Sequence, residues 1–297
     1  MANNINFGKI YDSTWWGVGV TSNSINWGKS YLDLAGGGGA PLLLDTYTGA
    51  SVAYSLRKLT TAYAGSAIRV RRSSDNFESD IGFANNQLDT VSLLSFVGTG
   101  GTDNGFVTTW YDQSGNANNA VQTFATFQPK IVNAGTLILQ NGSPTIDFDG
   151  VDDGLSFTSN GYNIDSLSSY VLGKYDDLGP VIMFAFSGFT GSARWYVTFG
   201  SNFGYAAATT AIPFTNDTNR NLFTMISGAN LGNTSAWFNG SLQGTATRVS
   251  AVTSNENGIG GFLNTNNANC NIQEIICYSR DTSTDRVEIE NNINSFY

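Results

Sequence analysis

Short segments of alternating apolar and polar residues recur along most of this 297-residue chain, and they constrain its fold more than any other feature. Alternation with a period of two is typical of a strand that buries one face. Glycine, asparagine and serine separate the segments, and these residues favour turns. The pattern therefore predicts an all-β sandwich. The alternating segments are residues 66–74, 105–113, 144–150, 179–188, 192–200, 221–228, 235–244 and 271–279.

Two or three short helices are expected between these strands. In residues 51–65 the apolar positions recur every three or four residues, which predicts an amphipathic helix. Residues 88–98 show a shorter version of the same pattern. The tail, residues 282–297, opens with a capping-box pattern from Thr282 to Asp285 and predicts a third helix.

The composition excludes several classes of function. The sequence contains no histidine, which excludes a Ser-His-Asp triad and the usual histidine-based metal sites. A net charge of −9 and a sequence pI near 4.3 argue against a nucleic-acid partner. No segment has the length and apolarity of a membrane span, and the first ten residues do not resemble a signal peptide. We therefore expect no membrane insertion and synthesis in the cytoplasm.

The two cysteines, Cys270 and Cys277, lie seven residues apart in a strand-like segment. Residues at that spacing in a regular strand point to opposite faces of the sheet. We therefore expect two free thiols and no disulfide bond.

Four aspartates gather in the segment "DFDGVDDG" at residues 147–154, in a pattern similar to a calcium-binding loop. Thr158 stands where an EF-hand requires a bidentate glutamate. Two interpretations remain open. The aspartates stabilise a solvated β-turn, or they bind Ca²⁺ at the edge of the sandwich. The candidate ligands are Asp147, Asp149, Asp152 and Asp153.

A seven-residue pattern occurs twice near the start of the chain, as "INFGKIY" at 5–11 and "INWGKSY" at 25–31, before the run "GGGG" at 36–39. This predicts an N-terminal segment, residues 1–40, followed by the sandwich at residues 41–297. Exposed aromatic side chains would make the segment a partner surface that anchors or oligomerises the protein. Alternatively, the two copies add strands to the sandwich. The predicted contact residues are Phe7, Tyr11, Trp15, Trp16, Trp27 and Tyr31.

Several motifs resemble known families. The segments "IDFDGVDDGLSF", "SAWFNGSLQG" and the closing strand and tail are similar to concanavalin A-like/laminin-G-like domains. Residues 53–76 and "TTWYDQSGNANNAVQ" at 108–122 resemble the catalytic domain of fungal-type α-L-arabinofuranosidase B. The same combination is found in structural proteins of tailed bacteriophages. The resemblance implies a jelly-roll β-sandwich with an N-terminal extension.

The resemblance to arabinofuranosidases also implies where catalytic carboxylates would lie. The family's nucleophile is the glutamate of an Asp-x-Glu-Asn strand, and its acid is an aspartate directly after a Gly-Gly pair. The matching positions here are Gly200 and Phe262, and the family's adjacent cysteine pair is missing. We therefore predict that the chain is not an enzyme. Asp112 in "YDQSGN" is expected to hydrogen-bond its own turn rather than to act as a catalyst.

The sequence favours a non-catalytic bacteriophage virion protein, a fibre, spike or decoration subunit, whose lectin-like sandwich binds a host-surface glycan. The alternatives are an active arabinofuranosidase-like glycoside hydrolase and a purely structural capsid or tail protein. The expected partners are other virion proteins and further copies of the chain, with a trimer favoured. An aromatic platform beside amide side chains is typical of sugar binding, although aromatic residues of a sandwich also form its core. The platform candidates are Trp195, Tyr196, Asn202, Phe203, Tyr205, Trp237, Asn239 and Asn266.

Overall fold

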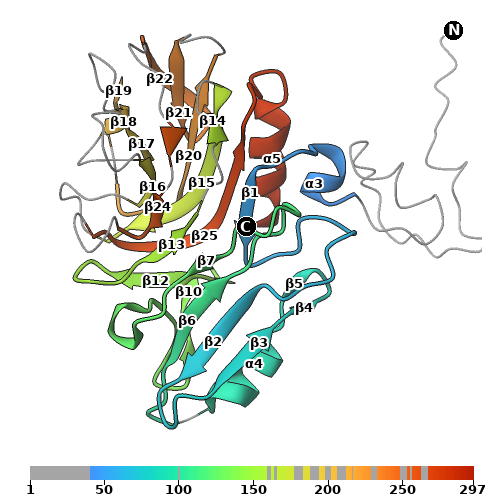
Figure 1. The fold of residues 1–297 in the computed structure, drawn as a ribbon, viewed down its shortest axis with the longest axis vertical. Helices are drawn as coiled ribbons and strands as arrows, with labels where there is room; N and C mark the ends of the chain where they lie inside the picture. Colours follow the sequence, from blue (N-terminus) through green and yellow to red (C-terminus); the bar gives the residue numbers. More distant parts are fainter. Residues whose placement is uncertain are drawn as a thin grey trace, which may run out of the picture. The chain divides into compact units, whose positions relative to one another are not determined.

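The chain is an all-β sandwich with short helices, as the sequence predicts (Figure 1). Its long strand ladders are antiparallel. The computed structural model describes residues 41–99, 101–158, 162–163, 166–176, 183–187, 194–197, 202–205, 212–215, 217–228, 233–247, 253–254, 256–261 and 267–297.

One sheet is organised around the longest strand, β25. Strands β1 and β12 pair with successive parts of β25 along one edge, and β15, β20, β21 and β22 follow in order on the other side. The strands of this sheet are β1 (Val52–Ser55), β12 (Ile146–Asp149), β15 (Ser168–Tyr175), β20 (Asn221–Ser227), β21 (Thr234–Phe238), β22 (Ser241–Ala246) and β25 (Asn269–Tyr278).

The second sheet runs in the order β3, β2, β6, β7, β13, β24, β16, β17, β18 and β19. Its strands are β2 (Ile68–Arg72), β3 (Glu78–Ile81), β6 (Gly105–Trp110), β7 (Ala120–Val121), β13 (Leu155–Phe157), β16 (Phe184–Ser187), β17 (Arg194–Val197), β18 (Asn202–Tyr205), β19 (Ile212–Pro213) and β24 (Glu256–Ile259). Six of the eight segments predicted as strands agree with observed strands to within a few residues. The observed strands are β2, β6, β12, β20, β21 and β25. The segments at 179–188 and 192–200 contain the shorter strands β16 and β17.

Short elements connect the two sheets. Strand β8 pairs with β6 of one sheet and with β12 of the other, so it joins them at one side. The remaining short strands are β8 (Lys130–Asn133), β9 (Thr136–Leu137), β4 (Phe83–Ala84), β5 (Gln87–Leu88), β10 (Leu139–Gln140), β11 (Ser143–Pro144), β14 (Tyr162–Asn163) and β23 (Thr253–Ser254).

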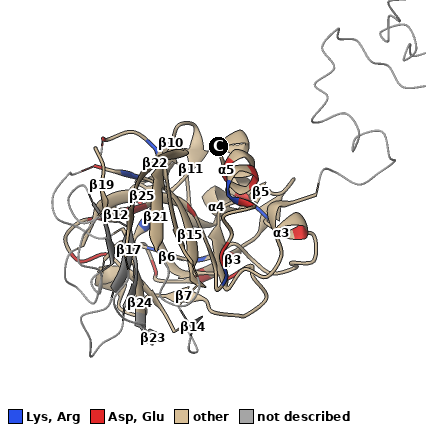
Figure 2. Ribbon diagram, turned by 90° about the horizontal axis from the view of Figure 1, so that it is seen from above, with Lys and Arg blue, Asp and Glu red and all other residues tan. Residues whose placement is uncertain are grey.

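The described helices, which Figure 2 labels, are α3 (Leu43–Thr46), α4 (Thr90–Val97) and α5 (Arg286–Phe296), with a 3₁₀ turn η2 (Ala125–Phe127). Helices α4 and α5 confirm two predicted helices. Asp89 caps α4 by accepting a hydrogen bond from the backbone N–H of Ser92 at 3.0 Å. The capping box predicted for α5 does not form, because the Thr282 hydroxyl bonds to Tyr170 instead.

The helix predicted at residues 51–65 was wrong. Residues Val52–Ser55 form strand β1, and all four are buried. Val52 belongs to the core between the sheets, whereas Ala53 packs on the opposite face, beneath α3 and α5. A strand that is buried on both faces carries a continuous apolar run, which periodicity alone cannot distinguish from a helix.

A β-bulge interrupts β25 at Gln273. Leu172 of β15 pairs with Glu274, whereas the next residue, Gly173, pairs with Ile272. Gln273 is therefore the extra residue on the bulged strand. The Gln273 side chain is buried, and its amide donates to backbone carbonyls of the β10–β11 hairpin.

The bulge changes the expected orientation of the cysteines. Because one residue is added, Cys270 and Cys277 both lie in the core between the sheets rather than on opposite faces. Both are free thiols, as predicted. Complete burial raises the pKa of each thiol, which keeps them protonated and unreactive.

Two hydrophobic clusters lie on either side of the β25 sheet. The larger fills the space between the sheets and includes Trp110, Phe148 and Phe223. The smaller joins the outer face of the β25 sheet to α3 and α5 (Figure 1). None of the described helices is long and apolar enough to cross a membrane.

Candidate functional site

The acidic segment forms a closed turn between β12 and β13. The Asp149 carboxylate accepts hydrogen bonds from the backbone N–H groups of Val151 at 2.8 Å and Asp152 at 3.3 Å. In return, the Asp153 carboxylate accepts from the backbone N–H of Asp149 at 3.1 Å. Gly150 adopts a φ of +75° and packs tightly against Asn269. We call residues 149–153 the acidic turn.

Burial makes Asp153 the most perturbed carboxyl group of this turn. Only 6% of the residue is exposed. Desolvation, followed by the negative charge of Asp149, raises the pKa of Asp153 to about 7. A carboxyl group with this pKa is partly protonated at neutral pH and can donate a proton, which is the property of a general acid.

The acidic turn lies against the Gly260–Gly261 pair. The Asn267 amide donates to the backbone carbonyl of Val151 at 2.5 Å, and the backbone N–H of Ala268 donates to the Gly260 carbonyl at 2.7 Å. Leu155 of β13 pairs with Ile259, the residue before the glycines. The acidic turn and the two glycines are thus linked through Asn267, Ala268 and the pairing of β13 with β24.

A row of polar side chains crosses the sheet beside the acidic turn. Asp147 pairs with Lys130 of β8 and with Asn271 of β25. Asn271 in turn pairs with Lys174 of β15, and its amide donates to Asp176 at 2.6 Å. Burial and then the charge of Asp176 raise the pKa of Asp147.

The structure brings together three of the four candidate calcium ligands. Oxygen atoms of Asp149, Asp152 and Asp153 lie within 4.8 Å of one another, and Asp147 is not in this group. The oxygen ligands suit Ca²⁺, which usually takes six to eight of them. The hydrogen bonds within the turn agree equally with the alternative of a β-turn stabilised by aspartate. Calcium binding therefore stays a prediction.

The sugar-platform candidates fall into two groups. Trp195, Tyr196, Asn202, Phe203 and Tyr205 lie on the paired strands β17 and β18, whose side chains are outside the described part of the chain, as is Asn266. Trp237 lies on β21 with the Arg286 guanidinium 4.6 Å above its ring. Asn239 turns the β21–β22 hairpin and donates to Asn221. Trp237 and Asn239 thus have structural partners, and the platform stays a prediction.

Asp112 is a structural residue, as the sequence indicates. Its carboxylate accepts hydrogen bonds from the backbone N–H groups of Ala53, Ser114 and Asn118 at 2.9 to 3.0 Å, and from the Ser114 hydroxyl at 2.7 Å. Gln113 likewise bonds the backbone around Leu59. The hexapeptide "YDQSGN" therefore connects β1 to the loop after β6 by hydrogen bonds. The four bonds occupy the lone-pair positions of the Asp112 carboxylate and leave none for catalysis.

Two further carboxylates, Asp80 and Glu78, lie on strand β3 beside Arg69. Arg69 pairs with Asp80 at 2.9 Å, and Tyr111 donates to the same carboxylate at 2.7 Å. Glu78 lies 3.9 Å from the Arg69 guanidinium. Gly200, Phe262 and the predicted partner-contact residues of the N-terminal segment lie outside the described residues.

This sandwich is shared with solved glycoside hydrolases. One is an arabinofuranosidase complexed with arabinofuranosyl-α-1,2-xylobiose (14% identity), another a GH54 α-L-arabinofuranosidase soaked with a cyclic sulfate inhibitor (17%). A third is a glutamate-to-glutamine mutant of a GH54 α-L-arabinofuranosidase soaked with 4-nitrophenyl α-L-arabinofuranoside (16%). Each has a TM-score of 0.63 and covers 84% of this chain, which spans 64% of each solved chain. No protein-family model and no curated protein matches the sequence.

The likeness overturns the prediction that the chain is not an enzyme. The solved structures that share its fold over 84% of its length are arabinofuranosidases. The prediction rested on Gly200 and Phe262, two positions aligned by sequence. A sandwich can bring carboxylates to one site from several strands and loops, so their absence at two aligned positions does not exclude hydrolysis.

Proposed function

We propose that the chain is a glycoside hydrolase of the arabinofuranosidase type, which removes α-L-arabinofuranosyl groups from a glycan. The observation that carries the proposal is the backbone likeness to arabinofuranosidases over 84% of the chain. The acidic turn supports it, because it holds a buried carboxyl group, Asp153, whose raised pKa suits a proton donor.

Hydrolysis of a glycosidic bond requires a proton donor and a second carboxylate that acts as nucleophile or base. Asp153 is the proposed donor, which gives its proton to the leaving oxygen. Asp152 is the proposed second carboxylate, while Asp149 holds the turn through its backbone hydrogen bonds. The three carboxylates lie within 4.8 Å of one another, close to the separation of about 5 Å in enzymes that retain the anomeric configuration.

Asp153→Asn is expected to reduce the hydrolysis of 4-nitrophenyl α-L-arabinofuranoside by about 10²–10⁴-fold, because amides do not donate the required proton. For the natural protein, kcat/KM should fall as the pH rises through about 7, where Asp153 loses its proton. The measurement is release of nitrophenol between pH 4 and 9.

Asp75→Asn serves as the matched control for this assay, because Asp75 is a surface carboxylate paired with Arg72. The control should hydrolyse at the natural rate. Unchanged turnover in Asp153→Asn would remove Asp153 from the mechanism. No turnover by the natural protein on this substrate or on arabinan would overturn the proposed function.

We propose as a second candidate that the sandwich is carried on a bacteriophage particle and binds a host-surface glycan there. The twice-repeated pattern in residues 5–11 and 25–31 supports this, because a repeated aromatic segment beside a separate domain suits an anchor to neighbouring subunits. In this proposal residues 1–40 contact other virion proteins or join the subunits of a homotrimer. Residues 41–297 form the domain exposed on the particle.

Deletion of residues 1–35 is expected to leave a folded sandwich that no longer trimerises or enters particles. Both described core clusters are built from residues between 43 and 293, so the fold should melt within a few degrees of the full chain. Circular dichroism melting and light scattering measure the two effects. An unfolded deletion variant would place the segment in the core instead of the anchor.

A further inference from the structure

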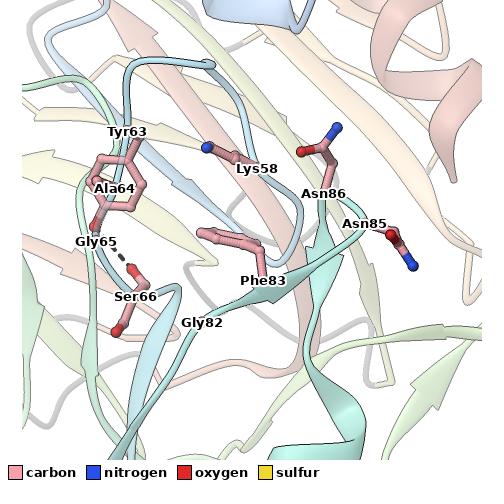
Figure 3. A pocket seen from close by; sticks show the side chains of 9 residues that line it. All are labelled: Lys58, Tyr63, Ala64, Gly65, Ser66, Gly82, Phe83, Asn85 and Asn86. Carbon is pink, nitrogen blue, oxygen red and sulfur yellow. Dashed lines mark hydrogen bonds between the residues drawn. The ribbon is translucent and has the colours of Figure 1, made fainter. Parts of the chain in front are cut away.

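A pocket lies between the loop that follows β1 and the β4–β5 hairpin, and no residue of the acidic turn lines it. Its volume is about 370 Å³, within the range of small-ligand sites. Figure 3 shows the side chains of Lys58, Tyr63 and Phe83 directed toward one common space, while Asn85 points away from it. The pocket is thus built from two segments about twenty residues apart in the sequence.

Two aromatic rings give the pocket a rigid apolar side. The rings of Tyr63 and Phe83 meet edge to face, with centroids 6.4 Å apart. The Tyr63 hydroxyl is fixed by donating to the Ser66 carbonyl at 2.9 Å. Burial raises the pKa of Tyr63 to about 12, so the phenol stays neutral. Phe83 packs against the main core, which holds its ring in place.

Lys58 supplies a positive charge to the same space. Its backbone N–H donates to the Asn86 carbonyl at 2.9 Å, which fixes the start of the side chain against the hairpin. The ammonium group makes only a long contact, 3.4 Å, to the Thr61 carbonyl. The residues that line the pocket include no carboxylate, so Lys58 has no counter-charge among them.

Asn85 and Asn86 shape the mouth of the pocket through the backbone. Both adopt positive φ angles, 52° and 63°, as a tight hairpin turn between Phe83–Ala84 and Gln87–Leu88 requires. The short turn keeps Phe83 opposite Tyr63. The site is therefore preformed rather than assembled by its ligand.

We propose that this pocket binds a uronic acid residue of a glycan. A sugar presents an apolar ring face that packs on aromatic side chains, and a uronic acid adds a carboxylate that matches the uncompensated Lys58. The choice of a glycan rests on the proposed function, but the site shares no residue with the acidic turn. It would let the protein hold an acidic polysaccharide while a neutral arabinofuranosyl branch is processed elsewhere.

Calorimetric titration with a galacturonic acid trimer and with a neutral galactose trimer tests the proposal. We expect the natural protein to bind the acidic trimer at least tenfold more tightly. Lys58→Gln should remove this preference, because it deletes the charge and keeps a polar side chain only one atom shorter. Phe83→Leu should weaken both ligands, with folding checked by its melting temperature. Arg280→Gln, which removes a surface charge outside the pocket, should bind like the natural protein.

The outcomes separate this proposal from the hydrolase. Equal affinity for both trimers, no binding of either, or a Lys58→Gln variant that binds like Arg280→Gln would overturn the pocket's assignment. Asp153→Asn should keep its affinity for the acidic trimer, since it leaves the pocket intact. If the natural protein binds the acidic trimer but hydrolyses no arabinofuranoside, the proposed hydrolase function is refuted and the proposed uronic acid site is supported.

Discussion

Glu274→Ala is expected to lower the free energy of unfolding by about 3–5 kcal/mol, because it leaves the Arg57 charge buried without its partner. Glu274 is fully buried in β25, and Arg57 is only 5% exposed. The guanidinium donates two hydrogen bonds to the carboxylate, at 2.7 and 2.8 Å. The Ser55 hydroxyl donates a third bond to it, at 2.7 Å.

The same arginine joins the sheet to the last helix. Its remaining nitrogen donates to Asn292 of α5 at 2.8 Å, and its guanidinium lies 4.8 Å from the centre of the Phe296 ring. Loss of Glu274 should therefore loosen α5 before the sheets separate. Amide hydrogen exchange is expected to speed up first in residues 286–296.

Denaturant unfolding measures the loss of stability, and Asp75→Ala is the matched control. Asp75 pairs with Arg72 at 2.6 Å on the surface, where solvent screens such pairs and they contribute little to stability. The double change Arg57→Met with Glu274→Leu should recover most of the stability, since an apolar pair carries no desolvation cost. A Glu274→Ala variant as stable as the control would show that water compensates the arginine.

The sequence predicts the sandwich well because alternation survives in strands with one solvated face, such as β2 and β6. It fails where both faces are buried. Residues Val52–Ser55 read as part of a helix, since the pattern does not show that α3 and α5 cover the outer face of this strand. The bulge at Gln273 is equally hidden, because it depends on register with β15 and on carbonyl groups of the β10–β11 hairpin.

The candidate site was visible only in part. The aspartates at 147–153 stand out in the sequence, and so does the turn chemistry of "DGVDD". Their proximity to Gly260–Gly261 depends on strand pairings between residues more than a hundred positions apart. The pKa of Asp153 depends on burial by the same pairings. No sequence motif predicts the Lys58 pocket, because its lining residues come together only where the β4–β5 hairpin lies against the loop after β1.

Gly260→Ala is expected to destabilise the protein by about 2–5 kcal/mol, the sum of a left-handed backbone cost of about 1–2 and an overpacking cost of about 1–3 kcal/mol. Gly260 has a φ of +77°, and an added methyl group would lie 1.9 Å from Cδ1 of Phe148. Phe148 is fully buried in the core and cannot move aside. Thermal and denaturant unfolding measure the combined cost.

Gly49→Ala separates the two contributions. Gly49 has a similar φ of +79°, but no atom lies within 4 Å of the added methyl group. This control should lose only the backbone part, about 1–2 kcal/mol. Adding Phe148→Leu to Gly260→Ala should restore stability relative to the sum of the single changes, because the ring that collides is gone. Equal losses in Gly49→Ala and Gly260→Ala would show that the glycine is required for its backbone angle alone, and that the contact with Phe148 relaxes.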